Sequence, residues 1–168
     1  KLYMLSGYGK LFCRKADDGA FVWSIDVIAE YGGVNLKWGY TENLMIDGDK
    51  VFCTVGGPVH NVIAVNKHTG KLIWSCKGKG EISAYGSPAL ITLSGRKVLV
   101  TQTASHILGI DASTGVLLWS HEQTNKYSVH ANSPLFHDGL LFNSSGYGTG
   151  GIMLQLYPDG SSVKEVWR

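Results

Sequence analysis

The sequence predicts an all-β protein built from four-stranded antiparallel units, which is the architecture of a β-propeller. Short apolar runs alternate with turn residues along the whole chain, and no window of ten or more residues keeps the apolar period of a helix. A phrase that ends in Trp also recurs, and its turn glycines (Gly19, Gly70, Gly115 and Gly160) are 51, 45 and 45 positions apart. A repeat of this length, made of short strands, is typical of one propeller blade.

Each repeat shows the same elements in the same order. A first strand ends in a tight turn such as Asp47-Gly48 or Asp138-Gly139, because Gly accepts the positive φ of a hairpin turn. A second strand, a looser glycine-rich loop and a third strand follow. A Thr-Gly turn, at Thr69-Gly70 and Thr114-Gly115, then leads to the fourth strand. The blade repeats lie near 1–26, 43–76, 87–121 and 132–168.

These repeats make about three and a half blades of a single partial propeller domain, residues 1–168. Propellers close with about 4–8 blades. We therefore expect a larger ring, either within a longer protein or completed by another chain. An incomplete ring also exposes unpaired strand edges, so self-association through these blade edges is a further expectation.

Antiparallel strand order predicts which loops share a face. The tight turns lie at one end of the strands, and the glycine-rich loops and the connections between repeats lie at the other end. Function on β-scaffolds concentrates in such longer loops. Residues just before each first strand point toward the propeller axis, where we expect a ligand-binding funnel. Its candidate residues are Trp38, Tyr40, Glu42, Tyr85, His130 and Asn132.

Glu42 is the candidate for an unusual charge state. A carboxylate beside Trp38 and Tyr40 would be partly desolvated, and burial raises the pKa of a carboxyl group. The alternative is a carboxylate that accepts backbone N–H bonds where the strand begins. The six histidines show no metal-binding spacing, and the sequence predicts neither a metal site nor a catalytic residue.

Composition excludes several classes of function. The chain carries 15 Lys and Arg against 13 Asp and Glu, with no long run of either sign, so neither nucleic acid nor an anionic membrane is an expected partner. No apolar stretch approaches the roughly 20 residues of a transmembrane helix. Cys13, Cys53 and Cys76 have no metal-binding spacing and are expected to be buried thiols.

The phrase Asp/Asn-x-x-Thr-Gly-x-x-x-Trp, at 66–74 and 111–119, resembles the tryptophan-docking repeat of pyrroloquinoline-quinone (PQQ)-like propellers. That group includes quinoprotein alcohol dehydrogenases and outer-membrane assembly lipoproteins. Segments 31–39, 47–58 and 145–150 are similar to a bacterial subgroup labelled polyvinylalcohol-dehydrogenase-like. The resemblance covers essentially the whole chain, and it implies that each repeat Trp packs between blades over the Gly of a Thr-Gly turn. The residues given this structural role are Trp23, Gly70, Trp74, Gly115, Trp119 and Trp167.

Two functions follow from the resemblance. The first is a non-catalytic binding or scaffold module of the bacterial cell envelope, periplasmic or secreted, with a peptide, protein or carbohydrate as its ligand. The alternative is a segment of a PQQ-dependent alcohol or polyvinylalcohol dehydrogenase that binds PQQ with calcium. The chain has no adjacent Cys-Cys pair, and only Glu42 and Asn132 are hard oxygen ligands near the axis, where calcium takes 6–8 oxygens. No cofactor is therefore expected.

Overall fold

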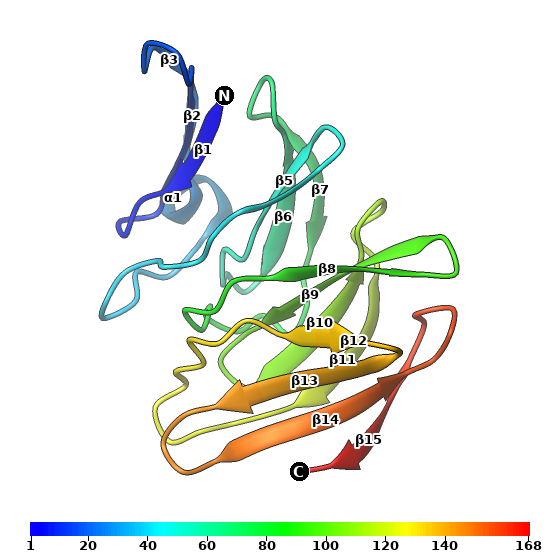
Figure 1. The fold of residues 1–168 in the computed structure, drawn as a ribbon. Coiled ribbons are helices and arrows are strands. Elements are labelled where there is room, and N and C mark those ends of the chain that lie inside the picture. The colour runs from blue at the N-terminus through cyan, green and yellow to red at the C-terminus, as the bar shows by residue number, and fades with distance from the viewer. The chain divides into compact units, whose positions relative to one another are not determined.

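The computed structural model describes residues 1–168 and confirms the all-β prediction: fifteen strands and one short helix make up its regular structure (Figure 1). The strands form four antiparallel sheets, and in each the strands pair in chain order. Sheet 1 consists of β1 (Leu2–Leu5), β2 (Lys10–Arg14) and β3 (Phe21–Asp26). Sheet 2 consists of β4 (Met45–Asp47), β5 (Lys50–Cys53), β6 (Val62–Asn66) and β7 (Leu72–Cys76).

Sheets 3 and 4 repeat the pattern of sheet 2. Sheet 3 consists of β8 (Ala89–Leu93), β9 (Arg96–Gln102), β10 (His106–Asp111) and β11 (Leu117–Glu122). Sheet 4 consists of β12 (Leu135–His137), β13 (Leu140–Ser145), β14 (Gly150–Leu156) and β15 (Val163–Trp167). The expectation of three complete four-stranded sheets is thus confirmed, and the sheet nearest the N-terminus has three strands.

The chain divides into two compact units, Lys1–Ser83 and Ala84–Arg168. Unit 1 contains sheets 1 and 2, and unit 2 contains sheets 3 and 4. In each unit, alternate apolar side chains of the two sheets meet in one core, as the period of two along a strand requires. The core of unit 1 includes Leu11, Cys13, Ile25, Val51, Ile63 and Val65. The core of unit 2 includes Val98, Val100, Ile107, Leu141, Ile152 and Leu154.

Trp23, the tryptophan of the first repeat, packs between the two sheets of unit 1. The ring of Trp23 lies on Gly70, and a Cβ added to this glycine would stand 2.9 Å from the ring carbons. The indole Nε1 donates a hydrogen bond of 3.1 Å to the backbone oxygen of Lys67. Trp74 and Trp119 are as buried as Trp23, whereas Trp167 is 47 % exposed.

The connection from β3 to β4 contains the one helix, α1 (Val27–Tyr31), which is too short for its apolar period to be recognised in the sequence. Asp26 caps it, since its side chain accepts bonds from two backbone N–H groups of the first turn, and Glu30 reaches back to the N–H of Asp26. Gly32, with φ 70°, ends it. The N–H of Val27 bonds to the oxygen of Gly9, so α1 closes against the turn between β1 and β2.

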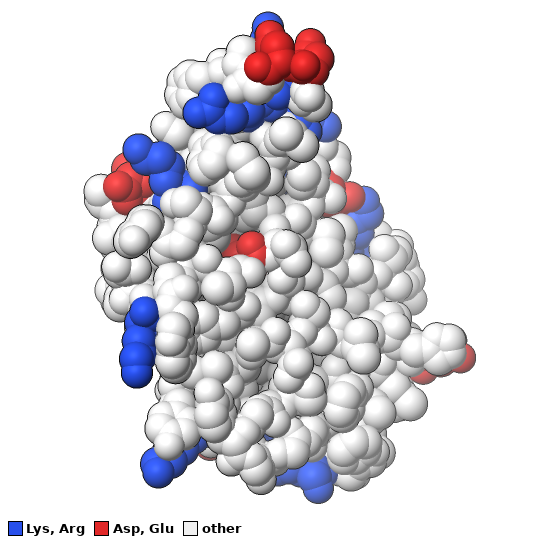
Figure 2. All heavy atoms as spheres, turned by 60° about the vertical axis from the view of Figure 1, so that its left-hand side comes forward, with Lys and Arg blue, Asp and Glu red and all other residues white.

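Charged side chains are dispersed over the surface. On the face that Figure 2 presents, Lys, Arg, Asp and Glu form small separate groups, and no continuous basic or acidic area is seen. None of the helical structure has the length and apolarity that crossing a membrane requires.

Candidate functional site: a pocket between two turns

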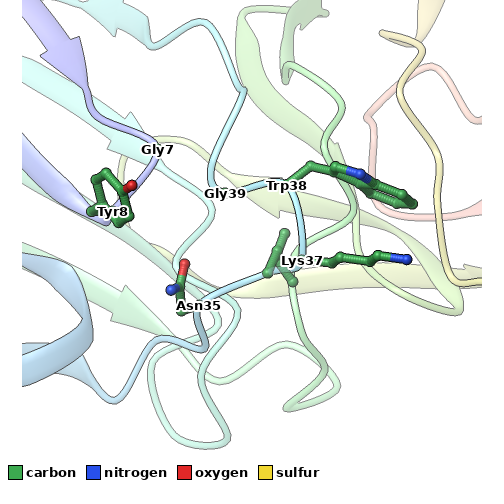
Figure 3. A pocket seen from close by; sticks show the side chains of 7 residues that line it. Gly7, Tyr8, Asn35, Lys37, Trp38 and Gly39 are labelled. Atoms are coloured by element: carbon green, nitrogen blue, oxygen red, sulfur yellow. The ribbon is translucent and has the colours of Figure 1, made fainter.

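A pocket of about 360 Å³ lies in unit 1 between two tight turns (Figure 3). The first turn, Ser6–Gly9, joins β1 to β2 and is closed by the bond from Gly9 N to Ser6 O (2.9 Å). The second turn, Leu36–Gly39, lies between α1 and β4 and is closed by the bond from Gly39 N to Leu36 O (2.9 Å). The residues that line the pocket are Gly7, Tyr8, Asn35, Leu36, Lys37, Trp38 and Gly39.

Two backbone features hold the turns in contact. Tyr40 N donates to Gly7 O over 3.0 Å, which ties the second turn to the first. Gly39 has φ 76°, and a Cβ at this position would lie 2.5 Å from Gly7 O. Only glycine combines this φ with so close an approach of the two chains. Backbone contacts therefore set the distance between the two turns that form the pocket.

Among the side chains that line the pocket, Leu36 is buried and the others are exposed. Tyr8 is 84 % exposed and Trp38 is 59 % exposed. Figure 3 shows Tyr8 and Asn35 on one side, while Lys37 and Trp38 extend side by side in the other direction. The ammonium of Lys37 lies 4.9 Å from the centre of the Trp38 ring, within the range of a cation–π interaction. The rim thus offers two aromatic rings, an amide that can donate and accept, and one cation.

Tyr40 and Glu42, which were predicted to share the funnel with Trp38, are buried beneath the second turn. The hydroxyl of Tyr40 donates to Val55 O (2.8 Å), and Oε1 of Glu42 accepts from Thr54 N (2.8 Å). Burial raises the pKa of Glu42 to about 7, although hydrogen bonds from Thr54 and Cys53 lower it. Both interpretations of Glu42 offered by the sequence thus apply at once: the carboxyl is desolvated, and it also accepts a backbone N–H.

The same burial acts on the neighbours of Glu42. It raises the pKa of Tyr40, with a smaller contribution from the charges of Cys53 and Glu42. It also raises the pKa of the Cys53 thiol, to which Glu42 adds by charge and by a hydrogen bond. At pH 7 the hydroxyl of Tyr40 and the thiol of Cys53 are therefore neutral, whereas Glu42, with a pKa of about 7, is about half protonated.

The other three predicted residues lie in unit 2. Tyr85, at φ 74°, pairs with His130 in an isolated parallel bridge. His130 is fully buried, and its Nε2 lies 3.1 Å from Ala104 O. Asn132 is exposed, and its backbone oxygen lies close to Gly86. Three of the six residues thus lie in each unit. In unit 1 Trp38 is exposed, whereas Tyr40 and Glu42 are buried, and one funnel lined by all six stays a prediction.

Sequence reasoning did not select Tyr8, Asn35 or Lys37. A usable pattern exists, because Gly7-Tyr8-Gly9 recurs at 146–148, and the lysine followed by an aromatic residue at 37–38 recurs as Lys126-Tyr127. In unit 2 these segments meet: the rings of Tyr127 and Tyr147 lie 4.7 Å apart, edge to face. The ammonium of Lys126 lies 5.3 Å from the Tyr127 ring. A repeated aromatic residue between two glycines, paired with a Lys-aromatic dipeptide, would have identified both loop clusters.

No cluster of three or more His, Cys, Asp or Glu side chains is placed to hold a metal ion. The three cysteines are free and buried, as expected. His68 lies exposed in a turn, and His137 lies exposed at the end of β12. Nδ1 of His60 lies 2.6 Å from the hydroxyl oxygen of Ser75. The side chains that line the pocket can stack on a ligand and can form hydrogen bonds with it.

The family of the chain follows from a match along nearly its whole length. The model of the family described as outer membrane protein assembly factor BamB matches residues 1–167. The chain belongs to this PQQ-like propeller family. Each sheet is accordingly one blade, so the structure is part of a propeller. No curated protein matches the sequence significantly.

Solved structures show the same fold. The quinohemoprotein alcohol dehydrogenase ADHIIG of Pseudomonas putida HK5 matches with TM-score 0.62 and 15 % identity, over 98 % of this chain and 32 % of that one. The quinohemoprotein alcohol dehydrogenase of Comamonas testosteroni matches with TM-score 0.62 and 17 % identity, over 96 % and 32 %. The computationally designed Ika4 protein matches with TM-score 0.56 and 16 % identity, over 98 % and 83 %.

The chain thus spans about a third of the length of these PQQ-like dehydrogenases. At such identities the likeness concerns the fold, because one fold supports many functions. The narrower assignment to the polyvinylalcohol-dehydrogenase-like subgroup stays a prediction.

Proposed function

We propose that this propeller is a non-catalytic binding module and that the pocket between the turns Ser6–Gly9 and Leu36–Gly39 binds a carbohydrate. The observation that carries the proposal is the pocket itself, whose walls are fixed by backbone contacts and whose rim is aromatic. Its volume of about 360 Å³ falls in the usual range of small-molecule sites.

The polar groups at the rim suit a neutral or weakly anionic sugar. Asn35 presents an amide, whose donors and acceptor can meet neighbouring hydroxyl groups, and Lys37 supplies the one positive charge at the rim. The exposed faces of Tyr8 and Trp38 can stack on the apolar face of a sugar ring at low entropic cost. A peptide added as an extra strand would need an open strand edge, whereas this pocket is built from turns.

Titration calorimetry with a panel of neutral and acidic oligosaccharides, and with unrelated peptides in parallel, tests the proposal. We expect an oligosaccharide to bind, and Tyr8→Ala and Trp38→Ala each to raise its Kd at least about 10-fold, the equivalent of one lost stacking contact. Tyr157→Ala is the matched control, because Tyr157 is an exposed tyrosine in the turn between β14 and β15. Binding of peptides alone, or equal loss in the control variant, would refute the proposal.

The residues present do not fit PQQ with calcium. The carboxylate of Glu42 is buried and already accepts the N–H of Thr54, and no other acidic side chain joins it in a cluster. Calcium takes 6–8 oxygen ligands. We therefore keep only as an alternative the hypothesis, drawn from the sequence, that the chain is a segment of a quinoprotein dehydrogenase. Calcium-dependent PQQ binding by this chain, lost in Glu42→Gln, would favour it over the binding module.

We further propose that the module acts in the bacterial cell envelope, in the periplasm or as a secreted protein. Its membership of a family described by an outer membrane assembly factor supports this location. The dispersed surface charge supports a polysaccharide or protein partner over nucleic acid. Fractionation of the native host, with the chain recovered from the envelope or the medium, tests the location.

A further inference from the structure

A loop cluster in unit 2 contains the same kinds of residue as the pocket of unit 1. Tyr147 lies between two glycines in the turn from β13 to β14, and Lys126-Tyr127 lies in the connection from β11 to β12. The pocket of unit 1 is likewise lined by a tyrosine that follows a glycine, and by a lysine that precedes an aromatic residue. We call the three side chains Lys126, Tyr127 and Tyr147 the unit 2 cluster.

Hydrogen bonds of Asn125 tie together the two loops that carry the cluster. Its Nδ2 donates to Oγ of Ser145, the last residue of β13 (2.9 Å), and its Oδ1 accepts from Tyr127 N (2.9 Å). Ser128 N donates to Asn125 O (3.2 Å) and closes the turn around Tyr127. Tyr147 has φ 61°, a left-handed conformation that a bulky residue adopts only where its surroundings hold it. Both rings are therefore positioned by their loops.

The two tyrosine rings form an exposed corner. Their centres are 4.7 Å apart and their planes make an angle of 66°, which is an edge-to-face contact. Tyr127 is 55 % exposed and Tyr147 is 57 % exposed. Such rings can stack on the apolar face of a sugar ring, while their hydroxyl groups donate to and accept from the hydroxyl groups of the sugar.

A lysine without an acidic partner lies beside the aromatic rings in both units. The ammonium of Lys37 lies 4.9 Å from the centre of the Trp38 ring, and that of Lys126 lies 5.3 Å from the centre of the Tyr127 ring. The ion pairs of the chain involve other cations, such as Lys67, so no carboxylate of the chain neutralises these two ammonium groups. A cation beside an exposed ring suits a sugar that carries a carboxylate.

The unit 2 cluster lies at the ends of strands. Because the strands of sheet 4 are antiparallel, the turn from β13 to β14 and the connection into β12 lie at the same end of the sheet. The core of unit 2, in contrast, is formed by side chains on the faces of its sheets. A further sheet packed on sheet 4 would cover a face, so the argument for the cluster does not depend on where the chain ends.

We propose that the unit 2 cluster is a second carbohydrate site and that both sites bind acidic sugars, so that the ligand is an acidic polysaccharide. The inference rests on the proposed carbohydrate-binding function, to which it adds a second site and the charge of the ligand. At each site an aromatic ring stacks on a sugar ring, and the lysine ammonium pairs with the carboxylate of that sugar. Nucleic acid also offers rings and negative charge, but its binding requires that several phosphates be neutralised, and each site contains one lysine.

Titration calorimetry at low ionic strength tests the inference. The ligands are oligosaccharides of galacturonic, glucuronic and mannuronic acid and the neutral oligosaccharides of the same lengths. We expect two sites per chain for an acidic oligosaccharide. Tyr127→Ala and Tyr147→Ala should each raise the Kd of one site about 10-fold, and Tyr157→Ala is the control. Lys126→Gln should raise the Kd for the acidic ligand about 3-fold to 5-fold and leave that for a neutral one unchanged, and Lys164→Gln, at an exposed lysine of β15, is its control.

Variants in the two units separate this inference from the proposed function. A single site that Trp38→Ala weakens and Tyr127→Ala does not would overturn the second site and leave the pocket in unit 1. A single site with the reverse response would refute the function proposed for that pocket and support the unit 2 cluster. Equal affinity for acidic and neutral ligands, or unchanged affinity in Lys126→Gln, would overturn the acidic ligand. Binding of a single-stranded oligonucleotide in place of every saccharide, or no binding at all, would overturn both proposals.

Discussion

The buried carboxyl of Glu42 makes the stability of the fold depend on pH in a direction opposite to that of most acidic residues. Burial raises its pKa from 4.5 to about 7. Between these two values the folded chain binds one proton more than the unfolded chain, so the free energy of unfolding falls as the pH rises from 4.5 to 7 and is constant above. The difference of about 2.5 pH units, at about 1.4 kcal/mol for each, amounts to roughly 3–4 kcal/mol.

Glu42→Gln removes this dependence, because an amide stays neutral and its oxygen can still accept the N–H of Thr54. The variant and the parent chain should be equally stable near pH 4, and the variant should be more stable by roughly 3–4 kcal/mol at pH 8. Urea denaturation followed by tryptophan fluorescence from pH 4 to 8 measures the difference. Glu122→Gln is the control, because Glu122 is exposed. Parallel pH profiles of the Glu42→Gln variant and the parent would refute the buried, protonated carboxyl.

Four further substitutions test the packing and one buried hydrogen bond, each by urea denaturation. Gly70→Ala should lower the free energy of unfolding by roughly 2–4 kcal/mol, since it combines strain at positive φ with overlap on Trp23. Gly19→Ala, at a similar φ but in open space, should cost only about 1 kcal/mol, and equal losses would contradict docking at Gly70. Trp74→Ala should cost roughly 3–5 kcal/mol, and a loss below about 1 kcal/mol would show that this ring is not packed. Tyr40→Phe should cost about 1 kcal/mol, because its hydroxyl donates to a buried carbonyl, and an unchanged midpoint would contradict that bond.

At the candidate site, the periodicity of the sequence does not predict which side chains share a face. Trp38, Tyr40 and Glu42 are two positions apart and were predicted to point into one funnel. Tyr40 and Glu42 do share a side, and both are buried. Trp38 lies in a closed turn that ends at Gly39 with φ 76°, so the alternation is broken between Trp38 and Tyr40. Side chains alternate between two faces with a period of two only along an extended strand. A turn with positive φ interrupts this alternation, so residues before and after the turn need not share a face.

The sequence by itself determined the sheets of this protein. Strand order and the propeller family could be predicted from local patterns, namely hairpin turns such as Asp47-Gly48 and the repeat that ends in Trp. Each of these patterns involves residues that are close in the chain. Only the tertiary structure decided the pocket and the charge state of Glu42. The pocket depends on the contact between Gly7 and Gly39, and the charge state of Glu42 depends on the burial of its carboxyl group. Both arise when segments distant in sequence pack together and exclude water, which no local pattern records.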